Sequence, residues 1–320
     1  MTYRLELGET VAAGAARVAR EELTSAIDGL AAADAAGRDK AVHEARKSLK
    51  KARAVLRLVR DGMDPSTYRE QNAALRDAGR GMSAARDARV LVDTLDGLTG
   101  RFADLLSPGA FSPVRDALAA EHEQLQARRA GDGAGVDGAV AAIGAARDAV
   151  DRWDVRDGPS LLPGGLRRIY ARGADRFAEA RAEPGPERMH EWRKRAKDLW
   201  YSTLLVAPAW PGPLGALADE AHTLADHLGD EHDLAVFAER VLADPGRFRS
   251  EADRATMADL AERRREELRS AALGLGRRVY AERPKAFVRR LAAHTRAWRD
   301  DGGETMPSPE LRSKVRSSDR

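Results

Sequence analysis

The chain has 320 residues, of which 54 are lysine or arginine, 51 are aspartate or glutamate, seven are histidine and none is cysteine. The length predicts one or two domains with a hydrophobic core, and the lack of cysteine excludes a disulfide scaffold, a thiol nucleophile and a thiolate metal site. No apolar run resembles a signal peptide or approaches a membrane span, so we expect a cytoplasmic protein. The formal net charge of +3 gives, as a sum, no reason to expect a polyanionic partner.

The charges are segregated along the chain. Residues 38–60 carry nine lysines and arginines against two acids, and residues 254–299 carry thirteen against five. Residues 93–157 have the opposite balance, with twelve acids and seven bases. Electrostatic fields depend on the local distribution of charge and not on the total. The two basic segments are therefore consistent with a polyanionic partner.

The composition favours an all-α fold, since alanine, leucine, arginine and glutamate dominate and runs of β-branched residues are rare. Clusters of glycine and proline, which end helices, divide the chain into segments. In chain order the expected helices cover residues 9–33, 38–60, 67–98, 113–129, 136–153, 166–182, 187–206, 214–242, 252–273 and 285–299. The last residues, 301–320, are expected to form a disordered tail.

Two blocks of sequence recur in the same order. His43-Glu44-Ala45-Arg46-Lys47-Ser48-Leu49-Lys50 is echoed, 147 residues later, by His190-Glu191-Trp192-Arg193-Lys194-Arg195-Ala196-Lys197. Met82 to Val90 similarly parallels Leu228 to Val236. A repeat this long indicates a duplicated half of a domain rather than a solenoid. We therefore predict two similar helical bundles related by a pseudo-two-fold axis, with halves at about residues 1–157 and 158–300.

The first block places its cations on one face of a helix. At about 100° per residue, Arg46, Lys50, Arg53 and Arg57 lie within about 80° of His43, and Lys47 flanks them. The opposite face is apolar and consists of Ala45, Leu49, Ala52, Leu56 and Val59. In the second copy the equivalent face carries His190, Arg193, Lys194, Lys197 and Tyr201.

A solvated charged helix is the alternative to a binding site, but such helices normally alternate acids and bases. Here the face has almost no acid, and like charges one turn apart destabilise a helix. Because both copies keep the pattern, a bound polyanion is the simpler interpretation. Other arginines are candidates to extend the basic surface: Arg17, Arg20, Arg86, Arg89, Arg168, Arg172 and Arg176.

We do not assign three further features to ligand binding. Asp87 and Asp233 are expected to orient neighbouring bases, and the run from Arg263 to Arg265 is expected to be solvated. His222, His227 and His232 recur at steps of five and share no helical face, so neither a metal site nor a cofactor is expected.

The motif His-x-x-Arg-x-x-x-Lys-x-x-Arg, formed here by His43, Arg46, Lys50 and Arg53, resembles the CHAD family, the conserved histidine α-helical domain. Three other stretches resemble it too: Met189 to Tyr201, Leu228 to Leu234, and Leu275 to Phe287. The resemblance covers about residues 3–299. It departs from exact duplication where Trp200 stands in place of the first copy's Arg53.

The resemblance implies two four-helix bundles with a basic surface or pore between them, which binds inorganic polyphosphate without catalysis. Its phosphate ligands would be His43, Arg46, Lys47, Lys50 and Arg53, and their counterparts from His190 to Tyr201. Binding of this ligand would recruit the protein to polyphosphate granules. Glu6-Leu7-Gly8-Glu9 does not match the triphosphatase signature that some family members carry.

Three alternatives stay open at this point. Basic helices also suit nucleic acid, although stacking aromatics and recognition motifs are scarce. A granule-associated adaptor is compatible with polyphosphate binding. A metal-dependent phosphohydrolase is least favoured, because the sequence shows no cluster of ligands for the metal. The sequence does not specify an oligomeric state.

Overall fold

The computed structural model describes residues 3–34, 37–80, 82, 84–130 and 134–302, and all regular elements in these ranges are helical. The all-α prediction is therefore confirmed. The helices are α1 (Val11–Ala31), α2 (Arg38–Val59), α3 (Pro65–Arg80), α4 (Ala84–Arg101), α5 (Ser112–Ala130), α6 (Ala134–Ala149), α7 (Leu161–Ala182), α8 (Pro186–Val206), α9 (Pro211–Arg240), α10 (Glu251–Val279) and α11 (Pro284–Asp300).

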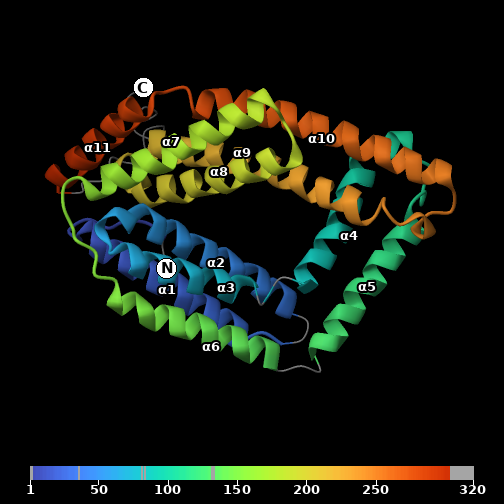
Figure 1. Cartoon of the computed structure of the whole chain (residues 1–320), viewed down its shortest axis with the longest axis horizontal. Helices are drawn as coiled ribbons and strands as arrows, with labels where there is room; N and C mark the ends of the chain where they lie inside the picture. The colour runs from blue at the N-terminus through green and yellow to red at the C-terminus, as the bar shows by residue number, and fades with distance from the viewer. Residues whose placement is uncertain (1–2, 35–36, 81, 83, 131–133, 303–320) are drawn as a thin grey trace, which may run out of the picture.

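The prediction of one helix is wrong. Residues 67–98 were expected to form a single helix, but the structure has two: α3 ends at Arg80 and α4 begins at Ala84, and they run in different directions (Figure 1). Gly79 lies in the last turn of α3, and the sequence has a second glycine, Gly81, directly after that helix. In a helix, glycine is less favourable than alanine by about 1 kcal/mol. Because the chain changes direction at this break, α4 and α5 pack away from the other helices of the first half. The expected tail falls mostly on residues 303–320, which lie outside the described residues.

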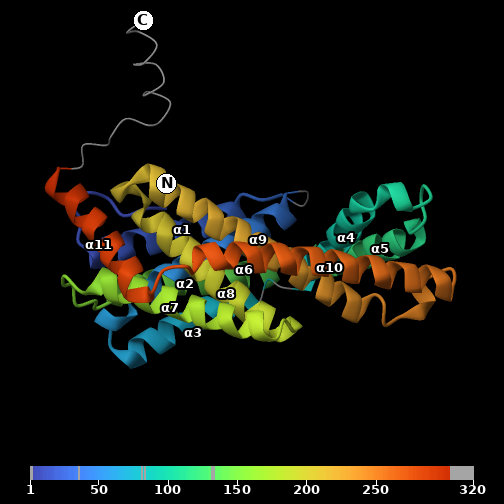
Figure 2. The same cartoon turned by 90° about the horizontal axis from the view of Figure 1, so that it is seen from above.

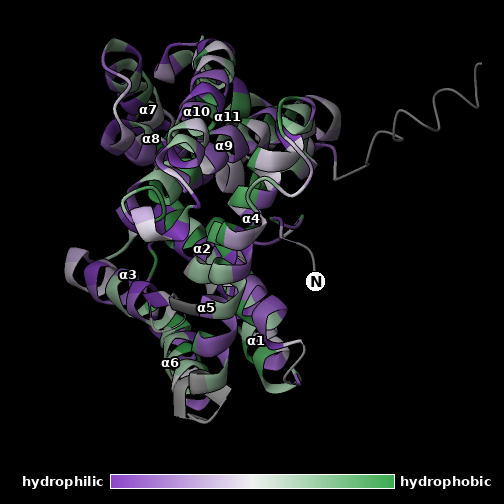
Figure 3. Ribbon diagram, turned by 90° about the vertical axis from the view of Figure 1, so that its right-hand side faces the viewer, coloured by the Kyte–Doolittle hydropathy of each residue, from purple (hydrophilic) through white to green (hydrophobic). Residues whose placement is uncertain are grey.

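The helices form two layers that face each other. In Figure 1 the lower layer contains α1, α2, α3 and α6, and the upper layer contains α7, α8, α9, α10 and α11. Figure 3 views this arrangement from one end, with α2 lying between the two groups. One large hydrophobic core runs through both layers, since it includes buried side chains of α1 and α2 as well as α7, α8 and α9.

Helices α4 and α5 pack elsewhere. They lie at the far end of the molecule, beside α9 and α10 (Figures 1 and 2). A second core joins them there, in which Leu95 of α4, Phe102 directly after α4 and Leu118 of α5 share a cluster with Phe237 of α9 and Met257 of α10. A hairpin from the first half is thus packed against helices of the second. The pseudo-two-fold relation and the division near residue 157 stay predictions.

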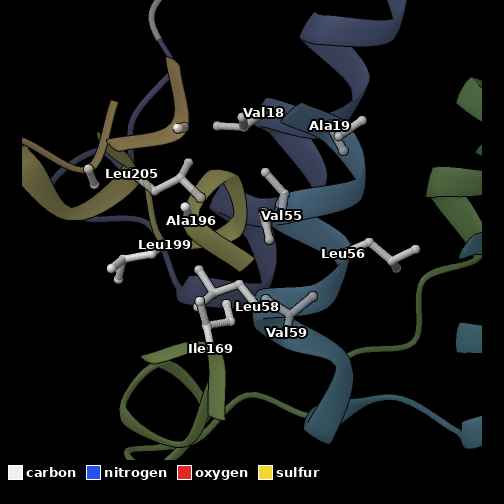
Figure 4. Close-up of a cluster of buried hydrophobic side chains, with 14 of the residues drawn as sticks. Val18, Ala19, Val55, Leu56, Leu58, Val59, Ile169, Ala196, Leu199 and Leu205 are labelled. Atoms are coloured by element: carbon white, nitrogen blue, oxygen red, sulfur yellow. The ribbon is translucent and has the colours of Figure 1, made fainter. Parts of the chain in front are cut away.

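The two layers make a close contact where α7 crosses the end of α2. Leu58 and Val59 of α2 lie beside Ile169 of α7 and Leu199 of α8 in the core (Figure 4). A Cβ atom on Gly165 would lie 2.0 Å from the backbone carbonyl oxygen of Leu58, which is far closer than any real contact. This crossing therefore needs a glycine, and it fixes α2 against the second half.

Replacing Gly165 with alanine should force α7 away from α2 and lower the free energy of unfolding by about 1–3 kcal/mol, as other overpacked sites do. Gly164→Ala is the matched control, because the nearest atom to its added Cβ is 3.9 Å away. That variant should be as stable as the wild type or up to about 1 kcal/mol more stable, owing to its higher helix propensity. Chemical denaturation measures both, and equal stability of the two variants would contradict the close crossing.

Candidate functional site

A cavity of ≈ 620 Å³ lies between α2 and α8, the helices that face each other across the two layers in Figure 1. Helix α9 and Val90 of α4 close its other sides. Among the side chains that the structure describes, nine basic ones line it and only two acidic ones, Asp198 and Asp233. The bases are Arg46, Lys50, Arg53 and Arg57 of α2, Arg193, Lys194, Arg195 and Lys197 of α8, and Arg240 of α9.

The cationic face of α2 points into this cavity because its opposite face is in the core. Ala45, Leu49, Ala52, Leu56 and Val59 are all at most 2% exposed, which confirms the predicted apolar face. Burial of that face leaves Arg46, Lys50, Arg53 and Arg57 as the side chains available to α8.

The structure brings together most residues of the two predicted faces. On α8 the face includes His190, Arg193, Lys194, Lys197 and Tyr201, and all five line the cavity. Two predicted residues of α2 are exceptions. His43 is exposed and Lys47 pairs with Glu44, and neither lines the cavity.

The carboxylate of Asp198 joins the two halves inside the cavity. Its Oδ1 accepts a hydrogen bond of 2.6 Å from Nη1 of Arg57, and its Oδ2 lies 2.9 Å from Nη1 of Arg195. Asp198 is only 5% exposed, so this carboxylate offsets one cation from α2 and one from α8 in a partly desolvated place. Sequence reasoning missed Asp198, and its position among bases is the one signal that would have drawn attention to it.

Other cavity cations are held by their neighbours. Nη1 of Arg46 donates a 2.7 Å hydrogen bond to the carbonyl oxygen of Gly79, near the end of α3. Nε of Arg53 donates to Oδ1 of Asn72, also on α3. Burial and the nearby Arg57 guanidinium lower the pKa of Arg53 to about 10, so it remains charged at neutral pH. These contacts orient the cations before any ligand is present.

The second repeated block supplies the support for α8. A Cβ on Gly229 would lie 3.3 Å from Nη2 of Arg193, so glycine leaves room for this guanidinium. Asp233, one turn further along α9, places Oδ1 3.7 Å from Nη1 of Arg193. The expectation that Asp233 orients a base across the bundle is thus in agreement with the geometry. For Asp87 the corresponding side chain lies outside the described residues.

His190 and His232 lie against each other at the cavity wall, with ring centroids 4.2 Å apart. Burial and the cations Lys194 and Arg193 lower the pKa of His190. Burial, His190 and Arg193 lower the pKa of His232 to about 4. Both rings are therefore neutral at pH 7. His232, which belongs to the repeated block from Leu228 to Val236, is also a residue of the cavity wall.

Two aromatic residues mark where the copies differ. Tyr201 lines the cavity but is 3% exposed, and its ring meets Tyr3 edge to face at 6.0 Å. Burial raises its pKa. Trp200, which replaces the Arg53 of the first copy, stacks on His222 at 3.8 Å and does not line the cavity.

None of the secondary arginine candidates whose side chains are described lines the cavity. Arg17 pairs with Glu9 and Glu21, and Arg20 pairs with Asp151. Arg172 is exposed. The remaining pairs are Arg89 with Asp93, Arg168 with Asp61, and Arg176 with Glu179. Arg86 belongs to α4, but its side chain lies outside the described residues.

The expectation of a fully solvated Arg263–Arg265 run is wrong for Arg265. Its side chain is buried, and Nη2 lies 3.0 Å from Oε1 of Glu231, which Arg269 also contacts at 3.0 Å. Glu231 has no exposed surface, so it needs cationic partners. This network ties α9 to α10 behind His232.

The described residues contain no group of three or more histidine, aspartate or glutamate side chains arranged to hold a metal ion. In the same part of the chain, no helix is both long enough and apolar enough to cross a membrane.

The model of the CHAD domain matches residues 21–242, which is more than half of the chain. The protein belongs to the CHAD domain family. The cavity helices α2, α8 and α9 all lie within the matched range. The predicted resemblance is therefore confirmed.

Two solved structures are similar to the chain. PptA from Streptomyces chartreusis superposes with a TM-score of 0.58 at 16% identity, covering 86% of this chain and all of its own. The CHAD domain from the plant Ricinus communis gives a TM-score of 0.46 at 15% identity, with 92% of this chain and 93% of that one covered. None of the curated proteins compared with the chain matches it.

Removing the Asp198 charge should destabilise the protein. Asp198→Asn leaves Arg57 and Arg195 close together without their shared counter-charge, and loss of one partner of a buried pair costs about 3–5 kcal/mol. Because both arginines are partly exposed, we expect a loss of about 2–3 kcal/mol in the free energy of unfolding.

Glu191→Gln is the matched control for this variant, since it breaks the pair with Lys194 on the same helix, in which the two side chains are 40% and 43% exposed. It should change stability by no more than about 0.5 kcal/mol. Urea denaturation compares the two, and an Asp198→Asn protein as stable as the control would contradict the role of Asp198.

Proposed function

We propose that this CHAD domain protein binds inorganic polyphosphate in the cavity between α2 and α8, without hydrolysing it. The observation that carries the proposal is the convergence of nine described basic side chains, four from each of two helices and one from a third, on one cavity in which two acids are described. Such a concentration of cations is costly unless an anion offsets it. The residues proposed to contact phosphate are those that line the cavity.

The kinds of side chain suit a chain of phosphates. Arginine offers a planar fork of donors and lysine a mobile point charge, and both bind phosphate oxygens well. From Arg46 to Arg57 the α2 face spans about 17 Å at 1.5 Å per residue, so it can follow several successive phosphates. The two opposed faces would grip a narrow strand from both sides.

The lining favours polyphosphate over nucleic acid. Base recognition by single-strand binders depends on exposed aromatic rings on which bases stack. Tyr201 is the aromatic ring other than histidine in this cavity, and it is almost fully buried. The cavity would therefore recognise its ligand by charge. Nucleic acid remains the competitor to test, and recruitment to polyphosphate granules follows from the same binding.

Isothermal titration calorimetry with polyphosphate tests the proposal. Lys50→Gln and Lys197→Gln each remove one cavity cation, and each should weaken binding about 10- to 100-fold, the value of a charged hydrogen bond. Arg20→Gln is the control, because Arg20 pairs with Asp151 on another surface; it should bind within about twofold of the wild type, by the small effect of exposed pairs.

Salt provides a second readout of the same experiment. With six or more phosphate contacts, affinity should fall about 10³-fold or more between roughly 50 and 200 mM salt. Each lysine variant should lower the slope of log affinity against log salt by about 1. Undetectable binding, an Arg20→Gln loss equal to the lysine losses, or displacement by duplex DNA at equal phosphate concentration would each contradict the proposal.

Binding should also take up protons. His190 and His232 are neutral in the free protein because burial and nearby cations lower each pKa, that of His232 to about 4. A polyanion favours the charged form, so each pKa rises on binding, and affinity should increase as pH falls from about 8 to 6. Calorimetry at pH 6 in two buffers of unlike ionisation enthalpy measures the protons taken up.

The double variant His190→Gln, His232→Gln is the control for this effect. It removes both rings from the wall of the cavity, while phosphate groups of the ligand keep their own titration. Proton uptake should fall in the variant. If the variant takes up as many protons as the wild type, the histidine pair has no part in the effect.

A further inference from the structure

Helix α11 carries a second row of cations, which the cavity does not use. Lys285, Arg289, Arg296 and Arg299 are all exposed. On a helix of about 100° per residue they fall within an arc of about 80°, and they span about 21 Å. We call these four residues the α11 stripe. They belong to the strongly basic segment 254–299, which the proposed cavity leaves unexplained.

The buried residues of α11 lie outside the arc of the stripe. Phe287, Val288 and Leu291 are buried, and α11 packs against α7. Ala292 and Ala293 are the residues between Arg289 and Arg296 near the arc, and they leave the long side chains around them unobstructed. All four members of the stripe are exposed, and Arg296 and Arg299 also line a cavity beside Glu9 and Asp157.

Ion pairing distinguishes the stripe from its surroundings. Arg290 lies outside the arc and pairs with Glu282. Within the part of the chain that the structure describes, no salt bridge joins Lys285, Arg289, Arg296 or Arg299 to an acid. Nε of Arg296 donates to the carbonyl oxygen of Ala292 in its own helix.

Arg299 differs from the other three members of the stripe. It contributes to lowering the pKa of Glu9 and that of Asp157, so its charge is partly offset by these acids. Lys285, Arg289 and Arg296 are therefore the members whose charge is most available to a ligand.

The chemistry of the stripe narrows the class of ligand. Its arc contains no aromatic ring on which a base could stack, and no large apolar side chain that could enter a lipid layer. Arginine and lysine at one-turn spacing recognise closely spaced anionic groups by charge alone. A strand of phosphates lying along α11 meets these conditions.

The stripe lies apart from the cavity. Helix α11 is at one end of the molecule, and α4, whose Val90 closes the cavity, lies towards the other end (Figures 1 and 2). None of the four stripe residues lines the cavity. They also lie beyond residues 21–242, which the family model matches.

We propose that the α11 stripe is a second binding site for inorganic polyphosphate, so that one protein molecule holds two strands. This inference rests on the proposed function, because the cavity supplies the first site. A protein with one site coats a strand, whereas a protein with two separated sites joins strands into a network. Its consequence is the cross-linking of long polyphosphate by the folded monomer.

The test uses the full chain and three sets of substitutions. The stripe variant is Lys285→Glu, Arg289→Glu, Arg296→Glu, in which Arg299 is kept because of its place beside Glu9 and Asp157. The matched control is Arg69→Glu, Arg152→Glu, Arg181→Glu, which makes the same charge change at exposed arginines that are scattered over the surface. The cavity variant is Lys50→Gln, Lys197→Gln.

Light scattering at about 50 mM salt measures cross-linking of long-chain polyphosphate, and calorimetry with a short chain resolves the two sites. The wild type should scatter strongly and bind in two steps. The stripe variant should lose the weaker step, with affinity reduced at least tenfold, and most of its scattering, while the cavity step persists. The scattered control should behave as the wild type, after all proteins are shown to be folded monomers.

The outcomes separate this inference from the proposed function. Scattering by the stripe variant equal to that of the scattered control would overturn the second site. So would a stripe variant that loses sedimentation with phosphatidylserine vesicles, or binding to duplex DNA, but still cross-links polyphosphate. A cavity variant that keeps the stronger step would instead refute the cavity as the first site, whatever the stripe does.

Discussion

Repulsion between the cations of α2 and those of α8 is the constraint on which the arrangement of this protein depends. Two like charges 4 Å apart repel by about 4 kcal/mol at an effective dielectric constant of 20. The cavity places basic side chains of both helices around one space, with Asp198 as a shared counter-charge. Something else must therefore keep the helices together.

The hydrophobic core behind the cavity supplies that force. The apolar face of α2 is buried among side chains of both layers, and Gly165 lets α7 approach the backbone of Leu58. The second core, which joins α4 and α5 to α9 and α10, closes the far end. Burial of apolar surface stabilises these contacts without regard to charge, so it can offset the repulsion. The cavity is consequently a preorganised site, and an anionic ligand would relieve stored electrostatic energy.

Much of this site follows from the sequence, because helical periodicity fixes which residues share a face. The face from Arg46 to Arg57 and its apolar opposite were both predictable from α2 alone. Periodicity gives no information on tertiary partners, however. It could not show that Asp198 binds Arg57, that Arg265 is buried against Glu231, or that Arg17 and Arg20 pair with acids elsewhere. The break between α3 and α4 was missed because alanine and arginine on both sides favour helix and obscure the effect of two glycines.

The near-neutral total charge has a structural meaning in this account. Acids pair with most of the secondary arginines at the surface, while the cavity keeps an excess of cations. A crystal structure of the complex with polyphosphate of defined short length is the most direct test of the central claim. The account predicts phosphate density between α2 and α8, with oxygens in hydrogen-bond distance of Nζ of Lys50 and Nζ of Lys197. A complex whose phosphates lie only on outer surfaces, with none in this cavity, would contradict it.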